Sequence, residues 1–330
     1  MSKSIYKTVF VLLLIVTAGG CKKSAAVTNV AKPQSSFRVT GYLLLSDIQA
    51  GNAANFDPGR ITDLNIAFIN PDANGDFAPL PVLNQLITTA HQQSVKVMAS
   101  IGGGAAPAYY SVLLSDDMRA AFIKNLVQLT VDHQLDGIDV DLEGPRIDSN
   151  YEAFLVDLRS ALKQHGKMLT AAIATAYAAQ YTDKALAQLD FVNIMSYDKT
   201  GPWNPANPGQ HAPYAMAVDD LGYWGNTRGI AKEKMSLGLP FYGYGFGPGA
   251  PADMTYSDII SQHPGAENAD SVKVAGGGMV YYNGIPTITA KTTLALQNAG
   301  GVMIWQLLQD ASGSKSLLSK IDATIQSAGK

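Results

Sequence analysis

The chain has 330 residues, of which 47% are hydrophobic and 15% are charged, and its formal net charge at pH 7 is -3. This composition is typical of a soluble globular protein. The sequence holds no cluster of Lys and Arg and no alternation of basic with aromatic residues, so nucleic acid is not an expected partner, whereas an uncharged polymer is compatible with the charge.

The N-terminal segment has the order of a signal peptide. Two lysines precede an apolar run at 9–16, and small residues then lead into Cys21. The run is too short to remain as a membrane span. Residues 1–20 therefore resemble a bacterial lipoprotein signal with Cys21 as the site of lipid attachment, although Ala18 stands where Leu is usual. The alternative is an unmodified cysteine in a plain signal peptide.

The segment 21–36 is small, polar and Pro-containing, as expected of a flexible tether. Cys21 is the only cysteine, so no internal disulfide is expected. We expect the remainder, 37–328, to form one large domain that acts as a monomer. Its expected location is the bacterial cell envelope, held to the membrane through the lipid anchor alone, or outside the cell if Cys21 carries no lipid.

From residue 37 onward, short apolar runs alternate with segments of helical period, which predicts βα units around a parallel sheet. The predicted strands are 38–46, 61–69, 95–103, 137–143, 168–176, 191–197, 235–243 and 301–308. Eight strands in a domain of this size predict an α/β fold of the (β/α)8 barrel type. The competing architecture, a doubly wound open sheet, lacks the glycine-rich phosphate-binding motif after a strand.

Two helices in this pattern have identifiable starts. Asn150 is expected to cap a helix that ends near Gly166, and Ser115 precedes another helix with an apolar stripe. One stretch breaks the alternation. Residues 247–284 lie between the seventh strand and the helix before the eighth, and they predict a small insertion on the face of the barrel where loops vary.

An acidic segment occupies the fourth predicted strand. Asp139, Asp141 and Glu143 alternate with apolar residues, so a strand would place the three carboxyl groups on one face. In a barrel that face points inward. Three buried like charges cannot all be ionised, so protons must be held or shared, leaving Glu143 able to act as a general acid. The alternative interpretation is a solvated acidic edge strand.

These residues resemble a known family. The segment 136–143 (DGIDVDLE) resembles the D-G-x-D-x-D-x-E signature of glycoside hydrolase family 18, carried on the fourth strand of a (β/α)8 barrel. The segment 100–103 resembles S-x-G-G, and 195–198 resembles M-x-Y-D. The strands at 237–243 and 300–305 are also similar to family segments. The resemblance spans about 38–310 and implies that 37–328 is a catalytic barrel.

The resemblance implies a retaining hydrolase of β-1,4-linked N-acetylglucosamine, with chitin or its oligosaccharides as substrate. Glu143 would be the proton donor and later the base, and Asp141 would orient the substrate's acetamido group. Asp139 would share a proton with Asp141. Tyr197 would donate its hydroxyl to the acetamido oxygen, and Trp305 would form the floor under the sugar ring.

Further candidates for substrate binding are less constrained. Asp198 and Trp203 follow the sixth strand and are expected to line the site. Tyr42 is a candidate whose side-chain direction the sequence leaves open. Gly102, with Ser100, is expected to shape the backbone near the acidic residues rather than to touch substrate. The five histidines have no metal-ligand spacing, so neither a metal nor another cofactor is expected.

The sequence departs from the common chitinase pattern beside the acid. Leu142 stands where an aromatic residue is common, and Gly144 stands where Tyr is frequent, which predicts a wider opening there. This leaves open an endo-β-N-acetylglucosaminidase acting on N-glycans. A glycan-binding protein that does not cut its ligand is a third alternative, against which Glu143 argues. Three tryptophans, 203, 224 and 305, are the candidates for sugar stacking.

Overall fold

The computed structural model describes residues 37–330 without residue 55, together with Met1. The expected signal peptide and tether, with Cys21, lie outside the residues that it describes. The fold centres on a closed barrel of eight parallel strands in the order β1-β12-β7-β6-β5-β4-β3-β2. Their bounds are β1 Arg38–Leu44, β2 Asp63–Ala67, β3 Lys96–Gly102, β4 Gly137–Asp141, β5 Met168–Ile173, β6 Phe191–Ile194, β7 Met235–Pro240 and β12 Gly301–Trp305. The predicted (β/α)8 barrel is confirmed.

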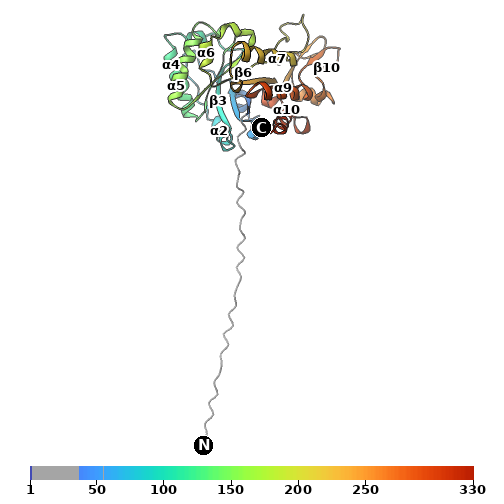
Figure 1. Ribbon diagram of the computed structural model, residues 1–330, viewed down its shortest axis with the longest axis horizontal. Helices are drawn as coiled ribbons and strands as arrows, with labels where there is room; N and C mark the ends of the chain where they lie inside the picture. Colours follow the sequence, from blue (N-terminus) through green and yellow to red (C-terminus); the bar gives the residue numbers. More distant parts are fainter. Residues whose placement is uncertain (2–36, 55) are drawn as a thin grey trace. The chain divides into compact units, whose positions relative to one another are not determined.

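Helices surround the strands, with α4, α5 and α6 on one side of the view in Figure 1 and α7, α9 and α10 on the other. The helices of the barrel are α1 Leu45–Gln49, α2 Leu83–Gln92, α3 Tyr110–Leu113, α4 Arg119–Asp132, α5 Tyr151–Gln164, α6 Asp183–Ala187, α7 Tyr214–Gly222, α9 Ile285–Asn298 and α10 Leu317–Ser327. Their apolar faces are buried against the strands, as α5 illustrates with Phe154, Leu155, Leu158 and Leu162. Within the described part of the chain, no helix is long and apolar enough to cross a membrane.

The two helix starts differ from the predicted capping. Asn150 occupies the position before α5, but its side chain makes no capping hydrogen bond. Its backbone N–H instead donates to Oδ1 of Asp148 at 2.8 Å, so the side chain of Asp148 stabilises this turn. The α4 helix begins at Arg119, whose N–H donates to the Ser115 carbonyl at 2.8 Å. Side-chain capping by Asn150 was therefore wrong, although both helices were correctly placed.

The predicted insertion is a separate antiparallel sheet of four strands in the order β10-β11-β8-β9. It comprises β8 Tyr242–Phe246, β9 Asp253–Thr255, α8 Tyr256–Gln262, β10 Ser271–Lys273 and β11 Met279–Tyr281. The run predicted as one strand at 235–243 is in fact two strands, joined by Phe241, and the insertion starts at 242 rather than 247. The apolar pattern continues unbroken through this junction, so the sequence gives no sign that one strand ends and another begins.

Phe241 marks where the chain leaves the barrel. Its N–H donates to the Trp305 carbonyl at 2.8 Å, which is the last bond of this segment to β12. The next residue, Tyr242, already pairs with Thr255 of β9. The inserted sheet is therefore attached directly to the carboxyl end of a barrel strand, the end at which catalytic residues of such barrels lie.

Candidate active site

The acidic residues of β4 lie inside the barrel. Asp139 is 0% exposed and Asp141 is 3% exposed, whereas the alternating Ile138 and Val140 belong to the apolar core between strands and helices. Glu143 follows the end of β4, is half-buried, and stands at the start of the single turn Gly144–Arg146. The predicted inward face of this strand is confirmed, and the solvated edge strand is excluded.

Asp139 is held by four donors from four other strands. The hydroxyl groups of Tyr42 and Ser100 donate to Oδ2 at 2.7 and 2.8 Å. The Thr170 hydroxyl and Asn193 Nδ2 donate to Oδ1 at 2.6 and 3.3 Å. Burial raises the pKa of Asp139, and these hydrogen bonds oppose that rise because they favour the ionised carboxylate.

Asp141 has a different environment. Its Oδ1 is buried and has no hydrogen-bond partner among the described residues. Burial raises the pKa of Asp141 well above its usual range, and the nearby charges of Glu143 and Asp139 raise it further. Within the described chain no hydrogen bond joins the Asp139 and Asp141 carboxyl groups, so the shared proton stays a prediction. Unlike Asp139, Asp141 thus has a buried oxygen that the described fold leaves without a hydrogen bond.

The backbone beside Asp141 requires glycine. Gly102 has φ +105°, and a Cβ atom there would lie 2.2 Å from the Asp141 carbonyl oxygen. The following N–H, of Gly103, donates to that same oxygen at 2.6 Å. Gly102 therefore acts on the backbone of the acidic strand, in line with the expectation for this residue, and it offers no side chain to a ligand.

Glu143 has the pKa of an acid that works near neutrality. Burial raises its pKa to about 7, and the negative charge of Asp198 contributes in the same direction. The backbone at Gly104 lies close to it, since a Cβ atom on Gly104 would stand 3.3 Å from Oε1 of Glu143. A carboxyl group with this pKa is present in both its protonated and its ionised form near neutral pH, so it can donate a proton and take one back.

Asp198 lies just after β6 with φ +62°, a conformation that favours Asn, Asp and Gly among the residues. The Tyr242 hydroxyl donates to its Oδ1 at 2.5 Å. The buried His211 lies with Nδ1 3.4 Å from the same oxygen. Sequence reasoning missed Tyr242 and His211, because Tyr242 was assigned to a barrel strand and nothing in the sequence relates His211 to Asp198.

Aromatic side chains form the remaining part of the site. Tyr197 is 8% exposed, and its hydroxyl lies 3.8 Å from Sδ of Met303. Trp305 is half-buried and stacks against Phe68, with ring centroids 5.6 Å apart and an interplanar angle of 27°. Its other neighbour is Tyr42, at 5.3 Å. Tyr42, Tyr197 and Trp305 belong to one cluster at the mouth of the barrel.

The sequence left two questions about aromatic residues that the structure answers. Tyr42 is 1% exposed and points inward to Asp139. Trp203 is 61% exposed and contacts Tyr244 edge to face at 5.2 Å. Trp224, in contrast, is 0% exposed and its Nε1 donates to the Thr175 hydroxyl at 2.9 Å. Trp224 was therefore wrongly counted as a candidate for sugar stacking.

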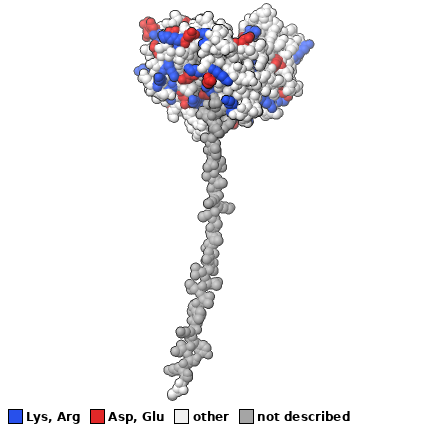
Figure 2. All heavy atoms as spheres, in the orientation of Figure 1, with Lys and Arg blue, Asp and Glu red and all other residues white. Residues whose placement is uncertain are grey.

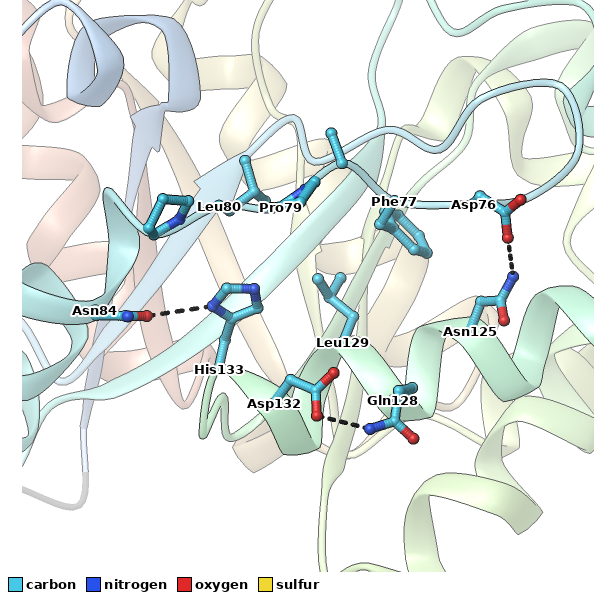
Figure 3. A pocket seen from close by; sticks show the side chains of 12 residues that line it. Asp76, Phe77, Pro79, Leu80, Asn84, Asn125, Gln128, Leu129, Asp132 and His133 are labelled. Atoms are coloured by element: carbon cyan, nitrogen blue, oxygen red, sulfur yellow. Dashed lines mark hydrogen bonds between the residues drawn. The ribbon is translucent and has the colours of Figure 1, made fainter.

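A pocket of about 640 Å³ lies away from these residues, between the loop after β2 and helix α4 (Figure 3). Its polar side chains bind one another: Asn125 donates to Asp76 at 3.0 Å and Gln128 donates to Asp132 at 2.6 Å. None of the candidate site residues lines it. Over the described residues, no group of three or more His, Cys, Asp and Glu side chains could hold a metal ion.

The surface shown in Figure 2 carries Lys and Arg side chains intermingled with Asp and Glu. No extended basic area is present on this face.

Comparison with known proteins agrees with this geometry. Residues 38–310 match the family described as glycosyl hydrolases family 18. A solved chitinase from the chitin utilization locus of Flavobacterium johnsoniae superposes with a TM-score of 0.80 and 34% identity, covering 88% of this chain and 94% of that one.

Two relatives known from sequence are more distant. The chain is 26% identical to chitinase-3-like protein 2 of Homo sapiens, over 67% of this chain and 71% of that protein. It is also 26% identical to chitinase B of Serratia marcescens, over 69% of this chain, and the match spans 52% of the length of that enzyme.

Proposed function

The chain belongs to glycosyl hydrolases family 18, and on that premise we propose that it is a retaining glycosidase that cleaves β-1,4-linked N-acetylglucosamine in chitin or chito-oligosaccharides. The observation that carries the proposal is Glu143, a half-buried acid with a pKa of about 7, beside Asp141, whose buried Oδ1 the described fold leaves without a hydrogen bond. This pair supplies a proton donor and a stabilising charge at the mouth of the barrel.

In this reaction the acetamido oxygen of the substrate replaces the second carboxylate that most retaining glycosidases use as nucleophile. Glu143 donates its proton to the glycosidic oxygen as the bond to the leaving sugar breaks. The acetamido oxygen attacks the anomeric carbon and forms a cyclic oxazolinium ion. Glu143, now ionised, then takes a proton from the water that opens this ring, which restores the acid.

Asp141 is suited to the cationic intermediate. Its free Oδ1 can accept a hydrogen bond from the acetamido N–H. In this proposal Asp141 passes its proton to Asp139 as the oxazolinium ion forms, and the negative charge that Asp141 then carries stabilises the cation. Asp139 cannot take this role easily, because both of its oxygens already accept hydrogen bonds from the barrel. Its part in the proposal is to fix the middle of β4 and to hold the proton that Asp141 gives up.

The aromatic cluster supports the binding of a sugar ring. Trp305 is backed by Phe68 and Tyr42, so its indole is held in place before substrate arrives. Tyr197 carries a hydroxyl whose contact with the Met303 sulfur is weak, and this hydroxyl is available to donate to the acetamido oxygen.

The experiment that tests the proposal is product analysis on two substrates. The protein is incubated with defined N-acetylglucosamine oligomers and, separately, with a high-mannose glycoprotein, and released reducing ends are identified. Cleavage of the oligomers supports a chitinase. Activity confined to the glycoprotein would replace it with an endo-β-N-acetylglucosaminidase, and binding of oligomers without any cleavage would indicate a glycan-binding protein.

A further inference from the structure

Gly144, the residue after the catalytic acid, leaves space beside Glu143. It is buried, has φ +52°, and begins the turn Gly144–Arg146. With Leu142 on the other side of the acid, neither neighbour in the sequence supplies an aromatic ring. From the sequence alone this position predicts a wide opening where the leaving sugar would lie.

In the structure, Tyr177 from the turn after β5 occupies that space. A Cβ atom on Gly144 would lie 3.7 Å from Cε1, 3.8 Å from Cζ and 3.9 Å from Oη of Tyr177. Tyr177 is half-buried, and after burial the charge of Glu143 is the cause that raises its pKa, which places the phenol beside the acid. An aromatic side chain thus stands against the backbone of Gly144, although it comes from the segment after β5.

The segment that carries Tyr177, the turn Thr175–Gln180, is fixed at three points. The Trp224 indole N–H donates to the Thr175 hydroxyl at 2.9 Å. Arg228 Nη1 donates to the Ala178 carbonyl at 2.9 Å. Gln180 Nε2 donates to the carbonyl of Gly144 itself at 3.1 Å. The segment that carries Tyr177 is therefore held in position before any ligand binds, which lowers the backbone entropy that binding would lose.

The positions of Trp305 and Glu143 in the barrel limit where the leaving sugar can lie. Trp305 ends β12, which is four strands away from β4 in either direction around the closed barrel. The glycosidic oxygen must lie between a sugar over Trp305 and the leaving sugar, and Glu143 must reach that oxygen. Tyr177 follows β5, the strand next to β4, and its ring stands against Gly144, so a sugar that leaves past Glu143 on the β5 side would pass over this ring.

On the basis of the proposed function, we propose that Tyr177 is the residue that binds the leaving sugar, by stacking its phenol ring on the apolar face of an N-acetylglucosamine pyranose. Gly144 and Tyr177 act as a pair: the glycine has no side chain, and the tyrosine occupies the space that this leaves. A methyl group at 144 would be in ordinary van der Waals contact with the Tyr177 ring, and a larger side chain would displace the ring; any side chain there would also strain a left-handed backbone.

The test compares two substrates that differ in the leaving group. In chitotetraose the leaving group is itself a sugar. In chitobiosyl fluoride the leaving group is fluoride, so no sugar occupies the position beside Tyr177. We expect Tyr177→Ala to lower kcat/KM for chitotetraose about tenfold, which is the size of one aromatic contact, and to leave kcat/KM for the fluoride unchanged. Tyr177→Phe keeps the ring and should retain the parent values on both substrates.

One further control variant tests whether the effect is specific to Tyr177. Tyr281→Ala removes a half-buried tyrosine of the inserted sheet that contacts Phe246, and it should leave kcat/KM unchanged for both substrates. If Tyr177→Ala lowers kcat/KM equally for both substrates, Tyr177 has a purely structural role. If it lowers kcat/KM for neither substrate, Tyr177 binds no sugar. Either result overturns the inference. Failure of the proposed function is visible separately, because the parent protein itself would then cleave neither substrate.

Discussion

The Tyr42 hydroxyl donates a 2.7 Å hydrogen bond to Oδ2 of Asp139 across the interior of the barrel, from β1 to β4. The same hydroxyl accepts a hydrogen bond from Asn193 Nδ2 of β6 at 3.2 Å. Tyr42 therefore links the first strand of the barrel to the acidic strand and to the strand before Tyr197. Two effects are expected when this link is removed, one on stability and one on rate.

Tyr42→Phe should lower the free energy of unfolding by about 1–2 kcal/mol, because a buried hydrogen bond to a carboxylate is lost while the ring is kept. It should also lower kcat, since Asp139 loses one of its four donors. Urea denaturation and initial rates on chito-oligosaccharides measure the two effects. Ser100→Ala removes the other donor to Oδ2 and is the matched comparison. A variant as stable and as active as the parent would show that the link has no role.

Glu143→Gln should lower kcat about 10²- to 10⁴-fold, because the amide cannot donate the proton in the bond-breaking step. The substitution keeps size and shape, so oligosaccharide binding should persist. Calorimetric titration with chito-oligosaccharides beside a rate measurement separates the two quantities. Turnover equal to that of the parent protein would rule out Glu143 as the acid.

The pH profile should report Glu143 directly. Its pKa is raised to about 7, so the proton donor is present below that pH and is lost as pH rises through it. We therefore expect kcat/KM to fall on the alkaline side with a midpoint near 7. Asp198→Asn removes the negative charge that helps to raise this pKa, and so the midpoint should move to lower pH. A midpoint that stays in place or moves upward would contradict the assigned interaction.

Asp141→Asn should stabilise the protein at neutral pH. Burial and the charges of Glu143 and Asp139 raise the pKa of Asp141 above its unfolded value of about 4. Stability from this group is complete below pH ~4 and is lost as pH rises toward the folded pKa, because the native state then holds a proton that the unfolded state has released. At pH 7 the variant should thus have a higher melting temperature than the parent, by about 2 °C for each 1 kcal/mol. At pH 3 the two proteins should have the same melting temperature. A lower melting temperature at pH 7 would refute the account.

Membrane attachment remains a proposal that rests on the sequence, since Cys21 lies outside the described residues. If Cys21 carries lipid, Cys21→Ser should move the protein from the membrane fraction to the soluble fraction of the producing bacterium. Fractionation with an antibody to the barrel measures this. Membrane association that the substitution leaves unchanged would remove the lipid anchor from consideration.

The barrel was predictable from the sequence because each strand is a short apolar run with its own boundary. The acidic strand was also predictable, since its place as the fourth of eight apolar runs favoured an inward-facing strand over a solvated edge strand as the interpretation of the alternation of Asp139 and Asp141 with apolar residues. The junction at Phe241 was not predictable. Apolar residues continue from β7 into β8, and only pairing partners distinguish the two strands, which the sequence does not display.

Contacts between distant residues account for the rest of the difference. The direction of Tyr42 depends on Asp139, 97 residues later. The position of His211 beside Asp198 depends on a loop whose path is fixed by the inserted sheet and by α9, where the buried Lys291 donates to the Ala212 carbonyl at 2.8 Å. The contact of Tyr177 with Gly144 is a further example, because neither residue is unusual in its own segment and only the fold brings the two together.

The attachment of the inserted sheet has a consequence for anyone who wishes to re-engineer this barrel. Because β8 continues from β7 with Phe241 alone between them, the sheet cannot be exchanged for a shorter loop at its visible edge without also removing Tyr242, whose hydroxyl holds Asp198. A graft must retain at least this first strand. Substitutions that alter the sheet are best placed in β10 or β11, whose residues lie farther along the chain from the barrel junction.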